Sequence, residues 1–561
     1  RSILATLWRG GGKMAGAAPA PAAATRHRRR KDGQADGRMQ AAKATEAASG
    51  ADWRGTYLLA AVLVVASGLF TLSFPFGRDQ GIHATIGYAL GEGLVTYRDV
   101  FNIKPPLTTA VHLLSQWLFG HSMVAIRALD LVVTLLAALG LVAIVRRCGL
   151  SRTAGAFAAL GLVLIYHSLS YWENAQTDGW AGFLVVGAVL AMLSGWARPA
   201  GGARRSWMAL AGVALGLAFA LKYTIGAAGL LVFAPLIARR QARFLPSDLV
   251  AVTLGGLAVL AAVALTLAAF GALGPFLDIQ SFIRSYIAYE TGGIALPRQV
   301  LRILQVWPLE AAVMLGAAAM AWDLVRRRAG LFHAIVALWL VAAAVSGLVQ
   351  GKGFIYHFLP LVPPLALLVA LAADRGMELF ARAGLRRPAL IAALAGAAMA
   401  LPTTTVGRAA FGIGALAGPA PVERMRRIIP PGVDFDIHAT LAFSERLSAR
   451  RSPGDGLFVW GYETMLYFLQ QEPPRYRYPY SWTFLVYFHA GRYTADIMAR
   501  LEADPPRHIV VQKQDATPWV TGRAESSHEF LQSFAPLAGF IDRRYRLVDE
   551  VPRFELWEIV Q

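Results

Sequence analysis

Long apolar segments recur along most of this chain. Residues 57–76, YLLAAVLVVASGLFTLSFPF, carry no charge, and a helix of this length crosses the ~30 Å hydrocarbon layer of a bilayer. Similar segments lie at 122–145, 153–171, 179–197, 207–221, 223–238, 249–273, 303–322, 331–349, 355–373 and 388–403. Lys222 divides the stretch from 207 to 238 into two short runs. The pattern predicts a polytopic α-helical membrane protein with about eleven transmembrane helices.

The segments between and after these runs have other patterns. Residues 80–92 and 106–118 alternate apolar and polar positions at helical spacing, which predicts two amphipathic helices lying on the membrane surface. From about 434 to 561, short β-like runs such as GLFVWG alternate with amphipathic helices, and the last two runs have the pattern of a closing hairpin. This end of the chain is expected to form an α/β domain. No glycine-rich phosphate loop follows its strands, which argues against nucleotide binding there.

Charge gives the orientation of the segments. Only 16% of the 561 residues are charged and the mean hydropathy is +0.46, whereas about 25% is usual for a soluble protein. The formal net charge is +19. Arg and Lys cluster in alternate links, at 146–152, 198–205, 239–243, 326–328 and 375–387. Because basic links stay in the cytoplasm, the charge reports topology and argues against a nucleic-acid partner.

This topology divides the chain into three parts. Residues 1–52, rich in Ala, Gly and Arg, are expected to form a disordered basic cytoplasmic tail. Residues 53–404 form the transmembrane domain, with a first outer loop at 75–121, and residues 405–561 form the outer α/β domain. The chain has one cysteine, Cys148, and neither a CxxC nor an HExxH motif. We therefore expect no disulfide framework and find no motif for a metal.

Charged side chains gather at the outer ends of the apolar segments. Asp79 follows the first segment directly, Glu173 and Asp178 bracket the link ENAQTD, and Lys222 ends another segment. Later outer links add Lys352 and His357 and, in FIRSYIAYE, Arg284, Tyr289 and Glu290. Ionisable groups at membrane depth are costly and generally serve a function. The alternatives are solvated loop charges at Asp79, Glu173 and Asp178, a Lys104 that anchors the loop on bulk lipid headgroups, and a surface-reaching Lys222. For the later links they are a satisfied interface histidine at His357 and an Arg284–Glu290 ion pair.

The stretch YRDVFNIKPPL at 97–107 has a lysine followed by two prolines. Pro105 and Pro106 suit the first turn of a helix, whose amide hydrogens lack partners, and a proline keeps the preceding Lys104 extended. A lysine at a helix start favours an anion, and at this depth that anion is expected to be a lipid phosphate. Arg98 either joins this site or pairs with Asp99 in a turn.

Carboxylates and basic groups at one face of a cavity suit a displacement on a phosphate-linked substrate. A carboxylate can take the proton of an attacking hydroxyl, while lysine, arginine and histidine can stabilise a departing phosphate. No nucleotide is expected outside the cytoplasm. An activated sugar there would therefore be carried on a lipid phosphate.

In these features the chain resembles the GT-C glycosyltransferases that use polyprenyl-phosphate sugars, especially the branch with bacterial aminoarabinose transferases of lipid A and protein O-mannosyltransferases. The matching stretches are RDQG, YRDVFNIKPPL, ENAQTD and YHFLPLVPPLALL, and LFVWGYETMLYFLQQEPPRYRYPY is similar to the outer domain of many bacterial members. The resemblance covers about 57–560. It implies a GT-C-like catalytic transmembrane domain in the bacterial inner membrane, with a cytoplasmic N-terminus and a periplasmic α/β domain.

The resemblance also implies site roles. Asp79 is expected beside the reaction centre as base or acceptor-orienting group, Lys104 on the lipid phosphate, and Asp178 holding Lys104 or the acceptor. The expected catalytic candidates are Asp79, Asp178 and Glu173, the donor-phosphate ligands Lys104, Arg98, Lys222, Lys352, Tyr356 and His357, and the loop contacts Arg284, Tyr289 and Glu290. Gln80 replaces a frequent Glu, and Ile103 an acidic residue of the aminoarabinose branch, which leaves the sugar open.

The expected function is transfer of a monosaccharide from a polyprenyl-phosphate donor to an acceptor hydroxyl at the periplasmic face, by a single inverting displacement. The partners would be the lipid-linked donor and a lipid, glycan or protein acceptor. No cofactor is certain, and a divalent metal is left open. The alternatives are a lipid or solute transporter or flippase, a ligase for lipid-linked oligosaccharides, and a non-catalytic assembly component. A transporter should show inverted repeats and broken mid-membrane helices, and the sequence shows neither.

Overall fold

The computed structural model describes residues 53–238, 241–288, 298, 300, 303–304, 307–385, 429, 431–452, 454–486 and 491–560. The predicted tail at 1–52 and the predicted span at 388–403 lie outside the described residues. The chain divides into two compact units, residues 1–55 and 56–561. Apart from the first three residues of the first helix, the elements below belong to the second unit.

Among the described residues, seven helices are long and apolar enough to cross a membrane. They are Trp53–Ser73, α4 (Met123–Arg147), α6 (Thr177–Trp196), α7 (Gly202–Leu221), α9 (Pro246–Ala269), α13 (Leu331–Leu348) and Ile355–Arg382, which joins η3 (Ile355–Leu361) to α14 (Val362–Arg382). Shorter apolar helices are α5 (Arg152–Tyr166) and Tyr223–Ile237, which comprises η2 (Tyr223–Phe233) and α8 (Ala234–Ile237). Helix α12 (Trp307–Val325) overlaps the predicted span 303–322. The prediction of a polytopic helical membrane protein is confirmed, whereas the count of eleven stays a prediction.

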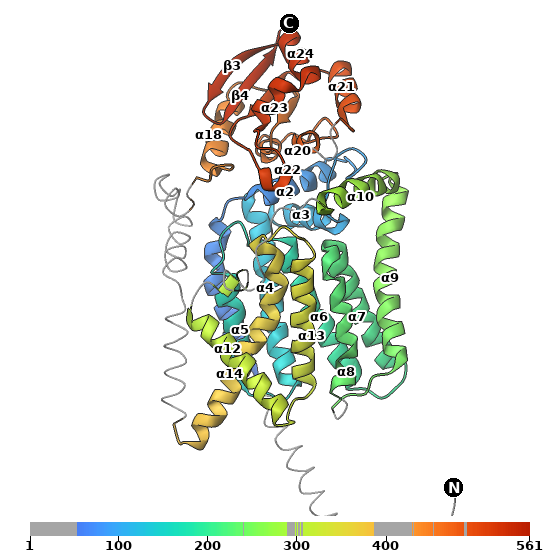
Figure 1. The fold of residues 1–561 in the computed structure, drawn as a ribbon, viewed down its shortest axis with the longest axis vertical. Coiled ribbons are helices and arrows are strands. Elements are labelled where there is room, and N and C mark those ends of the chain that lie inside the picture. The colour runs from blue at the N-terminus through green and yellow to red at the C-terminus, as the bar shows by residue number, and fades with distance from the viewer. Residues whose placement is uncertain are drawn as a thin grey trace, which may run out of the picture. The chain divides into compact units, whose positions relative to one another are not determined.

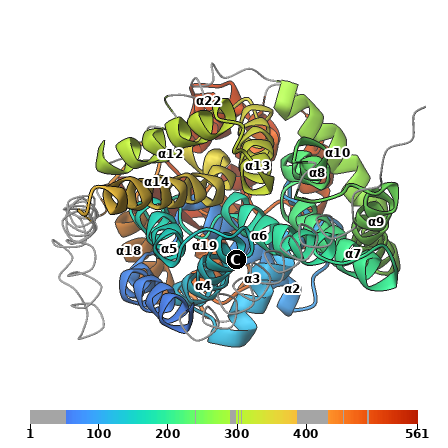
Figure 2. The same ribbon diagram turned by 90° about the horizontal axis from the view of Figure 1, so that it is seen from below.

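Small residues let the long helices approach closely. Helix α14 packs against α5 and α12, while α7 packs against α6 and α9 (Figure 2). A Cβ atom at Gly212 of α7 would lie 2.0 Å from the carbonyl oxygen of Val252, and one at Gly255 of α9 would lie 2.1 Å from that of Ala209. Backbone contact of this kind is typical of membrane helices, which gain little from apolar burial against lipid.

Arg127 holds the N-terminal end of α4 to two loops. Its side chain is fully buried and donates to the carbonyl oxygens of Pro75 (2.6 Å), Tyr171 (2.9 Å) and Asn174 (2.7 Å). Pro75 is the first residue of the loop 75–121, and the other two lie in the link that precedes Asp178. A buried cation needs several acceptors, so this one holds both loops in a defined position.

The two predicted surface helices are present. Helix α2 (Arg78–Gly91) and helix α3 (Pro106–Phe119) pack on each other. Helix α3 begins with Pro106 after Pro105 as its N-cap, in agreement with the prediction that these prolines start a helix. Both helices lie between the spanning helices and the C-terminal domain (Figure 1).

The C-terminal residues form an α/β fold with a four-stranded sheet of order β1-β2-β4-β3. Strand β1 (Leu457–Trp460) is parallel to β2 (His508–Gln512), and β4 (Phe554–Ile559) is antiparallel to both β2 and β3 (Tyr545–Val551). The helices are α18 (Ile437–Ser448), α19 (Met465–Leu469), α20 (Trp482–Leu485), α21 (Thr494–Ala503), α22 (Pro518–Thr521), α23 (Ser527–Ser533) and α24 (Ala535–Arg544). The predicted closing hairpin is β3–β4.

An aromatic core fixes this domain to the loops below it. Phe458 and Trp460 of β1 belong to one buried cluster with Phe101 of the first loop and Phe282 of α10 (Leu273–Ala288). The Phe101 amide donates to the carbonyl oxygen of Arg477 at 2.6 Å. Burial of large aromatic side chains is a strong stabilising term, so the domain and the Lys104 loop form one packed body.

Candidate active site

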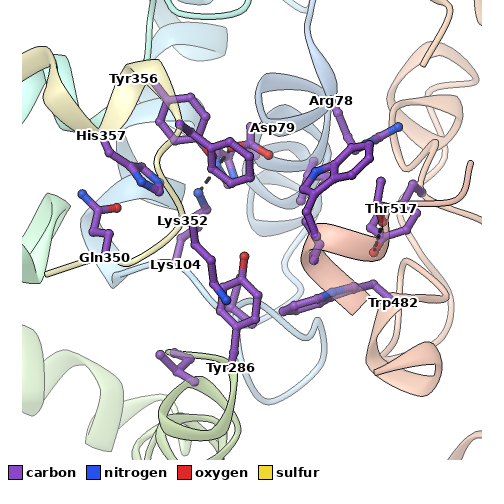
Figure 3. A pocket seen from close by; sticks show the side chains of 18 of the residues that line it. Arg78, Asp79, Lys104, Tyr286, Gln350, Lys352, Tyr356, His357, Trp482 and Thr517 are labelled. Carbon is purple, nitrogen blue, oxygen red and sulfur yellow. Dashed lines mark hydrogen bonds and ion pairs between the residues drawn. The ribbon is translucent and has the colours of Figure 1, made fainter. Parts of the chain in front are cut away.

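A cavity of about 680 Å³ lies where α2, the links at one end of the spanning helices and the α/β domain meet. Asp79, Lys104, Lys352, Tyr356 and His357 line it together (Figure 3). These side chains come from the first loop and from the link before α14, which are far apart in sequence. A concave site with a few convergent polar groups is the usual form of a small-molecule site.

Asp79 and Lys104 form an ion pair in this cavity. Asp79 lies in the first turn of α2, and its Oδ2 atom is 3.5 Å from Lys104 Nζ. Lys104 Nζ also lies 6.0 Å from the Tyr356 ring centroid. Burial alone would raise the pKa of Asp79, but the nearby Lys104, His83, Arg78 and Tyr356 together lower it. Asp79 is therefore ionised in the resting site.

The backbone around Lys104 is held by its own loop. The Lys104 amide donates to Asn102 Oδ1 at 3.0 Å, and its carbonyl oxygen accepts the Tyr97 hydroxyl at 2.7 Å. Asn102 in turn donates to Thr109 Oγ1 of α3 at 3.2 Å. These bonds and the rigid Pro105 direct the lysine into the cavity.

A second charged group lies beside the first. Lys222 Nζ is 3.0 Å from Asp178 Oδ2, and Gln350 Nε2 donates to Asp178 Oδ1 at 3.0 Å. Lys222 and Gln350 line the cavity, whereas Asp178 is fully buried behind them. Asp178 thus holds Lys222 rather than Lys104. Its place in the fold is that of a positioning group for the cavity wall.

Lys352 and His357 occupy the same side of the cavity (Figure 3). Lys352 Nζ lies 4.4 Å from the ring centroid of Tyr286 in α10, and burial lowers the pKa of this lysine. His357 packs edge-on against Tyr356, with ring centroids 4.6 Å apart. Its Nδ1 atom is buried with no hydrogen-bond partner among the described residues. Both groups can therefore meet a ligand.

Three further predicted residues, Glu173, Arg98 and Arg284, do not line the cavity. Glu173 accepts the Ser170 amide at 3.1 Å within its own link. Arg98 pairs with Asp99 at 2.7 Å and donates to the Phe270 carbonyl oxygen at 2.9 Å, which is the turn alternative. Arg284 is exposed on α10. Tyr289 and Glu290 lie outside the described residues.

Comparison with known proteins finds solved structures of similar fold. The crystal structure of ArnT from Cupriavidus metallidurans bound to undecaprenyl phosphate is similar at 17% identity and a TM-score of 0.58, over 91% of this chain and 99% of that chain. The apo structure of the same ArnT matches at 17% identity and a TM-score of 0.58, over 90% and 98%. The chain has a GT-C fold.

Sequence comparison matches part of this GT-C fold. A family profile described as dolichyl-phosphate-mannose-protein mannosyltransferase matches residues 103–268. The matched stretch includes Lys104, Asp178 and Lys222 but neither Asp79 nor Tyr356. A search of curated protein sequences gives no significant match. In the part of the chain that the structure describes, no group of three or more His, Cys, Asp or Glu side chains could hold a metal ion.

Sequence reasoning did not single out several residues that line this cavity, among them Gln350, Arg78 and His83. Arg78 donates to Asp434 Oδ2 at 2.9 Å and lies 5.0 Å from the Tyr462 ring centroid, so it joins α2 to the C-terminal domain. His83 lies one turn after Asp79 on the same face of α2, and neither ring nitrogen has a hydrogen-bond partner among the described residues. Burial lowers the pKa of His83 to about 3, so its ring is neutral. Its spacing from Asp79 could have revealed His83, whereas no local signal points to Arg78.

Proposed function

We propose that this protein transfers a monosaccharide from a polyprenyl-phosphate donor to an acceptor hydroxyl at the outer face of the bacterial inner membrane. The observation that carries the proposal is the Asp79–Lys104 ion pair in the wall of a cavity between the membrane helices and the α/β domain. The fold match supports it, since that ArnT structure holds undecaprenyl phosphate. The description of the matched family profile likewise names a sugar carried on a lipid phosphate, dolichyl-phosphate-mannose.

The cavity offers cations for the donor phosphate. Lys104 and Lys352 line it from two separate segments of the chain, and Lys222 adds a third positive charge that Asp178 holds in place. When the phosphate enters, Lys104 exchanges its contact with Asp79 for the phosphate oxygens. Preorganised cations stabilise the charge that develops on a leaving phosphate.

Asp79 serves the acceptor in this proposal. The acceptor oxygen forms a bond to the anomeric carbon while the bond from that carbon to the phosphate oxygen breaks, and the electron pair leaves with the phosphate. One displacement inverts the anomeric configuration. The hydroxyl proton passes to the Asp79 carboxylate. In the resting site Lys104 helps to lower the pKa of Asp79, so once Lys104 has turned to the phosphate the carboxylate becomes a better proton acceptor.

The proposed orientation, with α2, α3 and the α/β domain outside the cytoplasm, is supported by the alternate basic links. On that side the donor would be lipid-borne, since no nucleotide sugar is expected outside the cytoplasm. The hydrocarbon tail would lie between helices, where the protein surface is apolar.

The experiment uses a deletion strain, because the unused donor should accumulate there. Lipid extracts are analysed by mass spectrometry for polyprenyl-phosphate sugars, with and without the gene supplied in trans. Asp79→Asn and Lys104→Ala should clear the donor about 100- to 1,000-fold more slowly than the wild type, as for loss of one preorganised charge. The matched controls are Asp99→Asn, in the same loop, and Lys513→Ala, which loses only its exposed pair with Glu550.

Normal donor clearance by both site variants, at wild-type expression and thermal stability, would refute the site. A deletion strain without any accumulated lipid-linked sugar would refute the reaction itself.

A further inference from the structure

The α/β domain closes the cavity with aromatic rings that the proposed displacement does not use. We define the aromatic wall as Tyr462, Tyr480, Trp482 and Trp519, all of which line the cavity. Tyr462 follows β1, Tyr480 and Trp482 flank the start of α20, and Trp519 lies in α22. Figure 3 shows Trp482 beside Tyr286, across the cavity from His357 and Tyr356. The cavity therefore has a charged side and an aromatic side.

Trp482 presents an unused hydrogen-bond donor. Its side chain is only 4% exposed, and it packs edge-on against Phe282 at 5.1 Å and Tyr286 at 5.4 Å between ring centroids. Its Nε1 atom is buried without a hydrogen-bond partner among the described residues. Buried indole N–H groups usually find a partner, and leaving one unpaired is costly. The geometry calls for an acceptor atom supplied by an occupant of the cavity.

Trp519 presents an unused ring face. Its residue surface is 44% exposed although it lines the cavity. Pro518 precedes it in a short helix whose N-cap is Thr517, and Thr517 Oγ1 donates to the Tyr462 hydroxyl at 3.1 Å. These contacts fix the backbone that carries the indole. A rigid, half-exposed indole is a stacking surface with little ordering cost on binding.

The wall offers apolar faces and neutral hydrogen-bonding groups. Arg78, which lies 5.0 Å from the Tyr462 ring centroid, is paired with Asp434. A phosphorylated acceptor would require cations at this side. An uncharged sugar ring matches it better, because its C–H face packs on an aromatic ring while its hydroxyl oxygens can accept from an indole N–H.

We propose that the aromatic wall is the acceptor subsite and binds an uncharged sugar ring, so that the acceptor is a carbohydrate chain. This inference rests on the proposed glycosyl transfer. The donor tail is not the occupant, because the wall belongs to the domain that stands beyond the ends of the spanning helices (Figure 1), whereas a polyprenyl tail stays in the hydrocarbon layer. An acceptor that enters from the aqueous side would meet this wall first.

The test uses full-length protein labelled with 5-fluorotryptophan and followed by fluorine NMR. The Trp482 and Trp519 signals are assigned by their loss in Trp482→Phe and Trp519→Phe. The probes are a panel of uncharged methyl pyranosides and furanosides, a panel of serine- and threonine-containing peptides, and undecaprenyl phosphate. At least one glycoside should shift both signals. Loss of one stacked ring in Trp519→Ala should weaken that binding about tenfold, read at Trp482, whereas Trp117→Ala, an exposed tryptophan outside the cavity lining, should not.

Each other outcome overturns the acceptor subsite. No shift with any glycoside, shifts with the peptides instead, or shifts of both signals with undecaprenyl phosphate alone would each do so. A separate measurement tests the proposed function. Undecaprenyl phosphate should raise the unfolding temperature of the wild type but not that of Lys104→Ala. No rise in the wild type, or an equal rise in Lys104→Ala, would contradict the proposed function. The glycoside arm can thus fail while the lipid arm succeeds.

Discussion

Replacing Lys104 with methionine removes the charge that faces Asp79 and keeps most of the side-chain length. Lys104 Nζ and Asp79 Oδ2 are 3.5 Å apart, and the side chains of Lys104 and Asp79 are 18% and 22% exposed. Unit charges at this separation attract by about 5 kcal/mol at an effective dielectric constant of about 20. Desolvation offsets part of this, so we expect Lys104→Met to lower the free energy of unfolding by about 2–3 kcal/mol at neutral pH.

The wild type and the Lys104→Met variant should differ in how their stability changes with pH. In the wild type the pKa of Asp79 is lowered, so its stabilising contribution is present above the unfolded pKa and is lost only as pH falls through the folded one. Without Lys104, burial, which is the largest influence, raises the pKa of Asp79. The variant should then lose stability as pH rises from the unfolded pKa toward neutrality.

The assay is thermal unfolding of detergent-solubilised wild type, Lys104→Met, Asp79→Asn and the double variant, at about pH 5 and about pH 7.5. The loss of stability of Lys104→Met relative to the wild type should be larger at the higher pH. Adding Asp79→Asn should restore most of that lost stability in the double variant. Equal deficits at both pH values, or a double variant as unstable as Lys104→Met, would refute the electrostatic reasoning.

Three further predictions concern long-range contacts. Arg78→Ala leaves Asp434 unpaired and should make the α/β domain more susceptible to limited proteolysis, at a cost of about 3 kcal/mol; wild-type protease resistance would contradict it. Lys222→Ala leaves the buried Asp178 uncompensated and should destabilise by about 3–5 kcal/mol, with most stability regained on adding Asp178→Asn; thermal unfolding of both variants decides. Gly212→Val places a side chain against an α9 carbonyl that a Cβ atom alone would approach to 2.0 Å, and folded protein in size-exclusion chromatography should be lost, while Gly187→Ala, with open space at its Cβ position, should fold normally.

Local patterns predicted much of the fold. Apolar runs marked the spanning helices because the bilayer requires both length and apolarity from each segment. The helix start at Pro106 followed from proline chemistry, and alternation near the C-terminus predicted strands that the structure places in one sheet. Asp79 and Lys104 are only 25 residues apart, so a single loop could bring them together.

Local sequence patterns did not predict which distant parts of the chain are in contact. Arg78 and Asp434 are 356 residues apart, and Asp178 meets Lys222 instead of Lys104. The aromatic wall likewise comes from separate segments that read locally as ordinary core residues. A hydrophobic pattern states which face of an element is buried, but not which element covers it.

The amino-acid sequence by itself determined the membrane-spanning segments, the surface helices and the concentration of charge on one side, because each depends on the solvent that a segment meets. Only the tertiary structure decided which charges are partners and which aromatic rings face the cavity, because these depend on packing between elements distant in the chain.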